Sequence, residues 1–252
     1  MNAVAAELAF TLHASPAARG GRCLVAVHGI SRNDAEIAEE FAPLADRYDS
    51  VLVVPRFDAH AFPDYQRLGR RGPAADRALQ RLLDRLIAQG TIAPGKVFLF
   101  GHSGGAQFVH RFAMAHPARV ARYVASAAGW YTLPDPELAF PFGIGACAER
   151  PDLAFRPEAF LAVPGQVLVG ARDVRTGPSL RRSGTLDAAQ GTTRLQRARH
   201  FVAAMEQAAA ARGMAAPLRL ATVADAAHRF SGLARRGGIV ALAGAALFET
   251  QP

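Results

Sequence analysis

Short apolar runs alternate along this chain with longer segments of helical periodicity, and this alternation constrains the fold more than any other feature. Six runs consist almost entirely of apolar residues: Cys23–Val27, Val51–Val54, Val97–Phe100, Ala121–Ser126, Gln166–Val169 and Leu218–Val223. Runs of this kind are typical of strands in a parallel sheet that is covered on both faces. Leu8–Leu12 is a candidate for an additional antiparallel edge strand.

Three of the longer segments repeat apolar residues at helical spacing. The first starts at Asn33, which with Glu36 has the spacing of an N-cap and N3 pair, the second lies between Pro73 and Gly90, and the third covers Leu195–Ala209. Strands that alternate with helices predict an α/β fold with a doubly wound, mostly parallel sheet and helices on both faces. The 252 residues fit a single domain over 1–252.

The segment 130–164 breaks this rhythm. It has no long periodic pattern and is interrupted by Pro134, Pro136, Pro141, Pro151, Pro157 and Pro164. We interpret it as an irregular, lid-like insertion of about 35 residues after the fourth strand.

The sequence Gly101-His102-Ser103-Gly104-Gly105 matches the pattern G-x-S-x-G in a strand-to-helix context. The strand Val97–Phe100 precedes it and a helix can follow it from Ala106 to Ala115. Such a tight turn forces the serine into a strained backbone conformation and lifts its hydroxyl above the sheet, and glycines let the turn close. The alternative is a glycine-rich turn that only begins a helix. The context favours Ser103 as a nucleophile.

A serine nucleophile needs a base, and the base needs an orienting acid. Asp173 comes shortly after the strand Gln166–Val169, and His228 comes shortly after Leu218–Val223. All three groups follow strand ends, where sites of open α/β sheets form. Asp225, three residues before His228, is an alternative acid. The chain order favours Ser103, Asp173 and His228 as a catalytic triad.

His28-Gly29-Ile30 follows the first of the six strands. A loop in this position supplies a backbone N–H to an oxyanion hole. We predict that the N–H groups of Ile30 and Gly104 form this hole, and that His28 has a structural role.

The segments VHGISRN, GHSGGA and SAAGWYTLP resemble the α/β-hydrolase superfamily, and more loosely its small bacterial esterases and polyhydroxybutyrate-depolymerase-like proteins. The resemblance spans residues 28 to 228 and implies a serine hydrolase that acts through an acyl-enzyme. A carboxylic-ester hydrolase of the EC 3.1.1 type, with a small-molecule ester as substrate and no cofactor, is the first expectation. A thioesterase or amidase with the same triad, or a binding protein without catalysis, is the alternative. Members of this superfamily often carry a lid where 130–164 falls.

Aromatic residues gather in two segments that leave the sheet at the expected catalytic edge. We predict that Phe57, His60, Trp130 and Tyr131 line an apolar substrate pocket. The alternative is that the aromatic rings of these segments pack inside the protein. Several arginines follow the same strand ends and would either favour an anionic acyl group or be solvated: Arg56, Arg67, Arg70, Arg71, Arg172 and Arg175.

The formal net charge is +8, but Lys96 is the only lysine and the arginines are scattered, so we expect no nucleic-acid partner. The start of the chain does not resemble a signal peptide and no apolar stretch is long enough to span a membrane, which favours a cytoplasmic protein without membrane association. The sequence contains no zinc-site or metalloprotease motif, so we expect no bound metal. The sequence leaves open the oligomeric state and whether Cys23 and Cys147 are paired.

Overall fold

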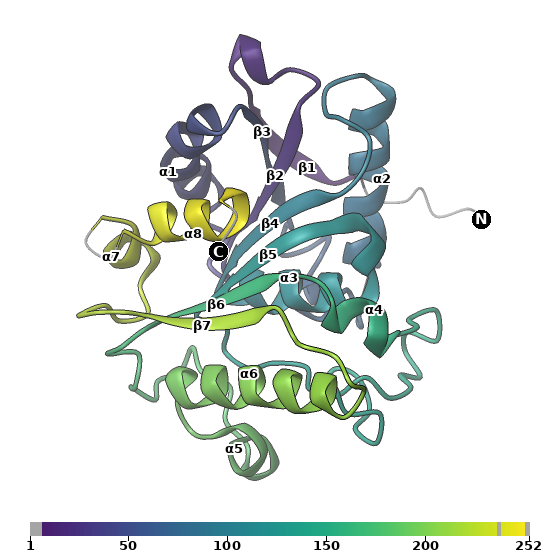
Figure 1. The fold of residues 1–252 in the computed structure, drawn as a ribbon, viewed down its shortest axis with the longest axis vertical. Coiled ribbons are helices and arrows are strands. Elements are labelled where there is room, and N and C mark those ends of the chain that lie inside the picture. The colour runs from purple at the N-terminus through teal and green to yellow at the C-terminus, as the bar shows by residue number, and fades with distance from the viewer. Residues whose placement is uncertain (1–6, 236–237, 250–252) are drawn as a thin grey trace.

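A computed structural model describes residues 7–235 and 238–249 of the chain. Seven strands form one sheet in the order β1-β3-β2-β4-β5-β6-β7 (Figure 1). The strands are β1 (Ala9–His13), β2 (Arg22–Val27), β3 (Ser50–Arg56), β4 (Val97–His102), β5 (Val120–Ser126), β6 (Gly165–Gly170) and β7 (Leu218–Val223). β1 runs antiparallel to β3 and the other strands are parallel. The structure therefore confirms the six expected strands and the edge strand.

Helices cover both faces of this sheet, as the sequence predicts (Figure 1). They are α1 (Asp34–Arg47), α2 (Ala75–Ala88), α3 (Gly104–Ala115), α4 (Pro157–Leu161), α5 (Gly184–Gln190), α6 (Arg194–Ala210), α7 (Phe230–Arg235) and α8 (Ile239–Phe248), with short 3-10 turns at Pro16–Ala18, Tyr65–Arg67 and Pro117–Arg119. Because side chains alternate along a strand, each strand contributes to two apolar cores. In β2, Val25 faces the core made with α2, α3, α4 and α6, whereas Leu24 and Ala26 face the core made with α1, α7 and α8.

The helix α8 has no counterpart among the predicted elements. Almost all of its residues are apolar or small, so it lacks the polar face that makes an amphipathic helix recognisable in a sequence. It packs closely on α1, because a Cβ on Gly244 would collide with the side chain of Leu44.

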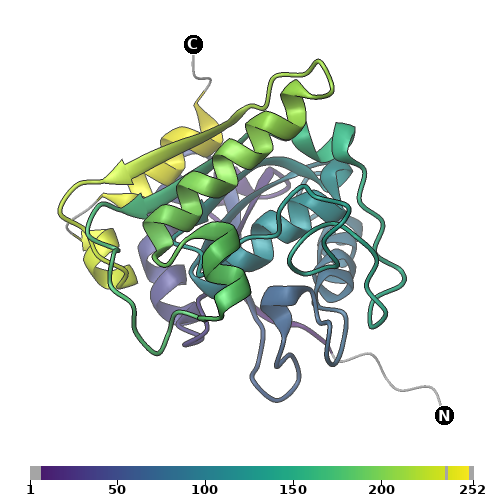
Figure 2. The same cartoon turned by 90° about the horizontal axis from the view of Figure 1, so that it is seen from below.

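The segment 130–164 connects β5 to β6, which are adjacent and parallel. It must therefore return from the carboxyl edge of the sheet to the opposite edge, and it does so as irregular loops that end in α4 (Figure 2). Arg150 fixes it to α2, because the buried Arg150 guanidinium lies 3.0 Å from the buried carboxylate of Asp76. The segment thus forms the crossover from β5 to β6, and its role as a lid stays a prediction.

Asn33 is the N-cap residue of α1, as expected, but its side chain does not cap the helix. The Asn33 Oδ1 atom accepts a hydrogen bond from the N–H of Gly29 at 3.3 Å, and the Asn33 Nδ2 group donates to Glu36 at 2.8 Å. The side chain therefore holds the loop that carries Ile30.

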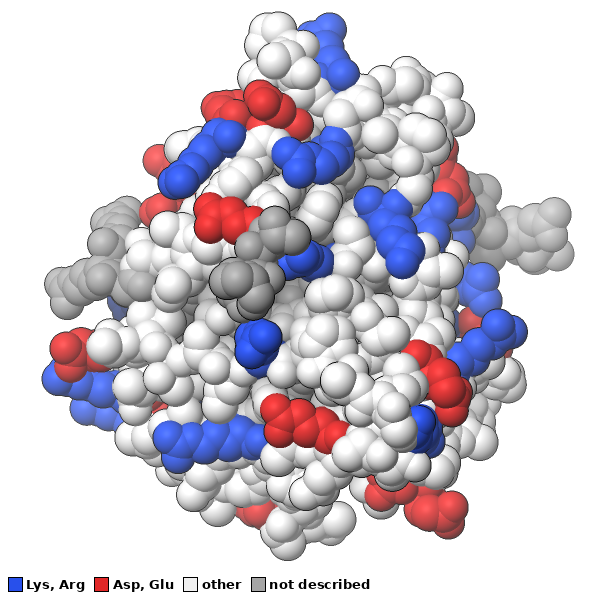
Figure 3. Space-filling view, in the orientation of Figure 1, with Lys and Arg blue, Asp and Glu red and all other residues white. Residues whose placement is uncertain are grey.

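Cys23 and Cys147 are both free thiols. On the face shown in Figure 3, basic and acidic side chains are interspersed. Within residues 7–235 and 238–249, no helix has both the length and the apolar character that crossing a bilayer requires.

Candidate active site

Ser103 lies in the sharp turn between β4 and α3, with φ 54° and ψ −107°. This is a region that L-residues rarely occupy, and strain of this kind persists only where the surroundings enforce it. A side chain on Gly101 would collide with the carbonyl of Gly105, and one on Gly105 would collide with the carbonyl of Val27. The two glycines are thus required for the turn to close against β2.

The structure brings the three predicted catalytic side chains together. The distance from His228 Nε2 to Ser103 Oγ is 3.2 Å, and His228 Nδ1 lies 3.1 Å from Asp173 Oδ2. The alternative acid, Asp225, instead forms an exposed ion pair with Arg172 at 2.6 Å. The geometry therefore joins Asp173, and not Asp225, to the histidine.

Asp173 is buried, and a second buried group lies behind it. Arg194, at the start of α6, places its Nη1 atom 3.4 Å from Asp173 Oδ1. The Nη2 atom of the same guanidinium donates to the backbone carbonyl and the hydroxyl of Ser179. Arg194 thus fixes both the acid and the loop that follows β6. Sequence reasoning missed it, because no motif marks an arginine at a helix start as a partner for a distant carboxylate.

His102 packs beside the candidate base, with its ring stacked on that of His228 at 5.2 Å. Its Nδ1 atom lies 3.1 Å from Ser126 Oγ. Burial, and then the neighbouring His228, lower the pKa of His102 well below its usual value. The His102 ring is therefore neutral at physiological pH and supports the His228 ring by packing.

The two predicted oxyanion donors lie next to each other. A Cβ on Gly104 would lie 3.0 Å from the backbone nitrogen of Ile30, so only a glycine leaves this space open. Neither N–H donates a hydrogen bond to another residue that the structure describes. Two adjacent free N–H groups beside a serine hydroxyl can stabilise an oxyanion.

The loop that carries Ile30 is held by neutral hydrogen bonds. His28 Nδ1 donates to the carbonyl of Gly29 at 2.8 Å, and His28 Nε2 accepts from the N–H of Phe57 at 3.0 Å. Burial lowers the pKa of His28, which keeps the ring neutral in this arrangement. The hydroxyl of Tyr65 donates to the carbonyl of His28 at 2.9 Å. The structure thus gives His28 a structural position, as the sequence predicts.

Two small cavities open on Ser103. One, of about 270 Å³, is lined by His228, Glu36 and Arg229, which places it on the side of the base. The other, of about 200 Å³, is lined by Gly104 and Trp130. Ile30, Ser103 and Ser179 belong to both cavities. The loop with Ser179 therefore forms part of each wall.

The four predicted pocket residues lie in different environments in the structure. Trp130 lines the smaller cavity, but Phe57 and Tyr131 are fully buried and do not. Phe57 stacks on Tyr65 beneath the Ile30 loop. The ring of Tyr131 stacks on Phe201 of α6, with the ring centroids 4.4 Å apart.

His60 is exposed, and its backbone N–H binds Asp58 in a local turn. Phe57 and Tyr131 thus pack in the core, the alternative that the sequence left open for aromatic rings, and His60 lines neither cavity on Ser103.

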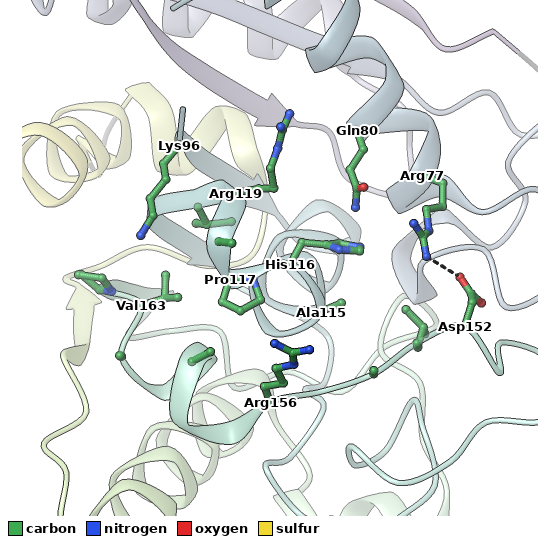
Figure 4. A pocket seen from close by; sticks show the side chains of 17 residues that line it. Arg77, Gln80, Lys96, Ala115, His116, Pro117, Arg119, Asp152, Arg156 and Val163 are labelled. Atoms are coloured by element: carbon green, nitrogen blue, oxygen red, sulfur yellow. Dashed lines mark hydrogen bonds and ion pairs between the residues drawn. The ribbon is translucent and has the colours of Figure 1, made fainter. Parts of the chain in front are cut away.

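A larger cavity, shown in Figure 4, is lined by neither Ser103, Asp173 nor His228. It has about 560 Å³ and is lined by Lys96, Pro117 and Val163, which stand before β4, β5 and β6. These residues mark the amino edge of the sheet, opposite Ser103. Size alone would therefore locate the reaction at the wrong edge. In the part of the chain that the structure describes, no group of His, Cys, Asp and Glu side chains could hold a metal ion.

No protein-family model matches the chain, and no curated protein sequence matches it significantly. Among solved structures, poly(aspartic acid) hydrolase-1 from Sphingomonas sp. KT-1 is similar, with 25% identity, a TM-score of 0.80 and coverage of 94% of this chain and 93% of that chain. A poly(3-hydroxybutyrate) depolymerase from Bordetella parapertussis has 28% identity, a TM-score of 0.79 and coverage of 97% and 87%. MPT51 of Mycobacterium tuberculosis, at 15% identity and a TM-score of 0.59, shares the fold over 96% of this chain and 100% of its own.

The fold and the enzyme class follow from these similarities and from the sheet order. The likeness extends over almost the whole chain, and it includes hydrolases at 25% and 28% identity. The chain is therefore a hydrolase with the α/β-hydrolase fold, of the esterase type.

Proposed function

We propose that the chain hydrolyses carboxylic esters through an acyl-enzyme on Ser103. The observation that carries this proposal is the continuous contact from Asp173 through His228 to the Ser103 hydroxyl, beside two N–H groups without acceptors. Each part has a defined task in acyl transfer.

In the first step the Ser103 oxygen attacks the ester carbonyl, and His228 Nε2 takes the hydroxyl proton. The Asp173 carboxylate accepts the Nδ1–H of the imidazolium and stabilises its charge. The N–H groups of Ile30 and Gly104 donate to the oxyanion. His228 then gives its proton to the departing alkoxide, and a water molecule, activated by the same imidazole, releases the acid.

The two cavities support an orientation for the substrate. The leaving oxygen must lie near His228 Nε2 to receive the proton, so the alcohol belongs in the cavity lined by His228. The acyl group then extends into the cavity lined by Gly104 and Trp130.

The similar structures support ester hydrolysis and also suggest the main alternative. One is called a depolymerase of poly(3-hydroxybutyrate), a polyester, and the other a hydrolase of poly(aspartic acid), a polyamide. Amide and thioester hydrolysis use the same triad and oxyanion hole.

A fluorophosphonate probe and a panel of esters, thioesters and amides test the proposal. We expect the probe to label Ser103, and Ser103→Ala or His228→Ala to lower kcat on the best ester by about 10⁴–10⁶-fold with the fold retained. Asp173→Asn should lower kcat strongly, whereas Asp225→Asn should have little effect, because Asp225 contacts only Arg172 among these groups.

Near-normal turnover by Ser103→Ala would contradict the mechanism, and an absence of both labelling and turnover would favour a binding protein. If Asp225→Asn were the damaging change, the acid would be misassigned. We expect activity to persist in the presence of a chelator.

A further inference from the structure

The cavity assigned to the acyl group is lined by more basic side chains than an apolar ester requires. Two arginines line it, Arg67 and Arg181, together with Gln66 and Gln107. Among the described residues that line it, none is acidic. The acyl group would therefore meet two guanidinium groups and no carboxylate.

A third arginine lies directly behind this wall. Arg111 of α3 is fully buried, and its guanidinium donates to Thr132 Oγ1, the carbonyl of Gln66 and Gln107 Oε1, all of them neutral. Its Nη2 atom has no hydrogen-bond partner in the described structure. A buried cation without a carboxylate is costly unless another anion compensates it.

The three guanidinium groups are close enough to influence one another. Burial, followed by the charge of Arg67, lowers the pKa of Arg111, and Arg181 adds to this effect. The carboxylate that offsets them is Asp64, which lies 3.3 Å from Arg67. The Arg67 Nε atom, like Arg111 Nη2, is buried without a partner. The Asp64 Oδ2 atom is also buried without a partner, so the unpaired atoms include an acceptor. With three guanidinium groups and one carboxylate, the cluster holds an excess of positive charge next to the cavity.

Trp130 connects the cluster to the reacting centre. The guanidinium of Arg111 lies over the Trp130 ring at 4.2 Å from its centroid, and that of Arg181 lies over it at 5.8 Å. The backbone of Arg181 is fixed, because its carbonyl accepts a hydrogen bond from the buried Arg197 at 3.0 Å. Arg181 thus lines the same cavity as Ile30 and Gly104, with its backbone fixed by Arg197.

We infer that the acyl part of the substrate carries a carboxylate, which Arg67 and Arg181 bind in the cavity beside Trp130. This inference rests on the proposed function and names its substrate class: monoesters of dicarboxylic acids, or amides of the same acyl shape. A guanidinium fork binds a carboxylate through two parallel hydrogen bonds, a geometry that Gln66 and Gln107 cannot supply.

The test compares two 4-nitrophenyl esters, an adipate monoester and a hexanoate ester, which differ in the charge at the end of the acyl chain. We expect the wild-type protein to prefer the adipate ester in kcat/KM, with a preference that decreases as salt increases. Arg181→Gln should lower kcat/KM for the adipate ester by about 10-fold and leave the hexanoate ester within about 2-fold, since a charged hydrogen bond contributes roughly this much. Arg67→Gln should do the same.

Arg175→Gln is the matched control. Arg175 is exposed on the loop between β6 and α5, which also carries Arg181, and it lines neither of the two cavities that open on Ser103. The substitution removes the same charge from the protein, so it should leave both esters unchanged. Equal kcat/KM for the two esters in the wild type would overturn the inference. So would an equal loss on both esters in Arg181→Gln, which would mean that Arg181 only supports the Trp130 ring.

Binding of both esters to Ser103→Ala separates this inference from the proposed function. Tighter binding of the adipate ester, weakened by Arg181→Gln, supports the carboxylate site even if the wild type hydrolyses neither ester. Hydrolysis of both esters with no difference in binding would retain the proposed function and reject the carboxylate site.

Discussion

Gly104 matters to the site because it has no side chain. Gly104 lies where a Cβ would be 2.7 Å from the Tyr65 hydroxyl and 3.0 Å from the Ile30 nitrogen. The conformation of the chain alone does not demand glycine here, because Gly104 is the first residue of α3. In the proposed mechanism, its small size lets the N–H groups of Ile30 and Gly104 approach the same oxygen atom.

We expect Gly104→Ala to lower kcat by about 10²–10³-fold, because a methyl group would displace the Ile30 loop and remove one oxyanion donor. Steady-state kinetics and a melting curve measure this effect. Gly184→Ala is the control, since a Cβ on Gly184 meets nothing within 4 Å. Unchanged kcat in Gly104→Ala, with an intact fold, would show that the oxyanion is stabilised elsewhere.

Among the elements, the crossover 130–164 is attached to α2 by a buried ion pair. Arg150 contacts Asp76 of α2 and also donates from its Nε atom to Asp152 at 2.8 Å. Its guanidinium also donates to the carbonyl of Leu68. A single side chain thus ties the segment to α2 and to the loop before it.

We expect Arg150→Met to lower the free energy of unfolding by about 3 kcal/mol, because Asp76 would remain buried with half of its partners. This corresponds to a melting temperature lower by roughly 6–12 °C, which calorimetry can measure. Arg156→Met is the matched control, because Arg156 is an exposed arginine of the same segment. Equal melting temperatures for the two variants would contradict this account of the attachment.

The sequence predicts elements well where one pattern decides them. Apolar runs identify the strands. Ser103, Asp173 and His228 each follow a strand end, and the structure brings these three predicted side chains together. The residues that line the pocket are harder to predict from the sequence. Trp130 and Tyr131 are adjacent aromatic residues. Trp130 lines a cavity, whereas Tyr131 stacks on Phe201 of α6, which is distant in the sequence. Contacts between distant segments decide such cases, and a single sequence does not contain them.

At the scale of the whole molecule, the same ion pair makes stability depend on pH. Burial raises the pKa of Asp76, but hydrogen bonds from His116 and Arg150 outweigh it and hold the pKa below its usual value. The hydrogen bond from Arg150 lowers the pKa of Asp152 to about 2. Carboxyl groups whose pKa is lower in the folded state stabilise the protein above their unfolded pKa, near 4, and lose this contribution as the pH falls toward the folded value.

We therefore expect the melting temperature to be nearly constant from about pH 7 to pH 5 and to fall below about pH 4. The difference between the wild type and Arg150→Met should decrease over the same acid range, because protonated Asp76 no longer needs a cationic partner. Melting curves across this range measure both effects. A difference that stays constant down to about pH 2 would mean that another group controls acid unfolding.

The order of the strands also bears on when the proposed triad can assemble. β4, β5, β6 and β7 are consecutive both in the chain and in the sheet, so each strand can join the edge left by the one before it as the chain is synthesised. Ser103 follows β4, whereas Asp173 and His228 follow β6 and β7. In the proposed mechanism, a chain whose last two strands have not yet joined the sheet has a nucleophile but no base. Turnover in a refolding reaction would then report only the molecules in which β6 and β7 have joined the sheet.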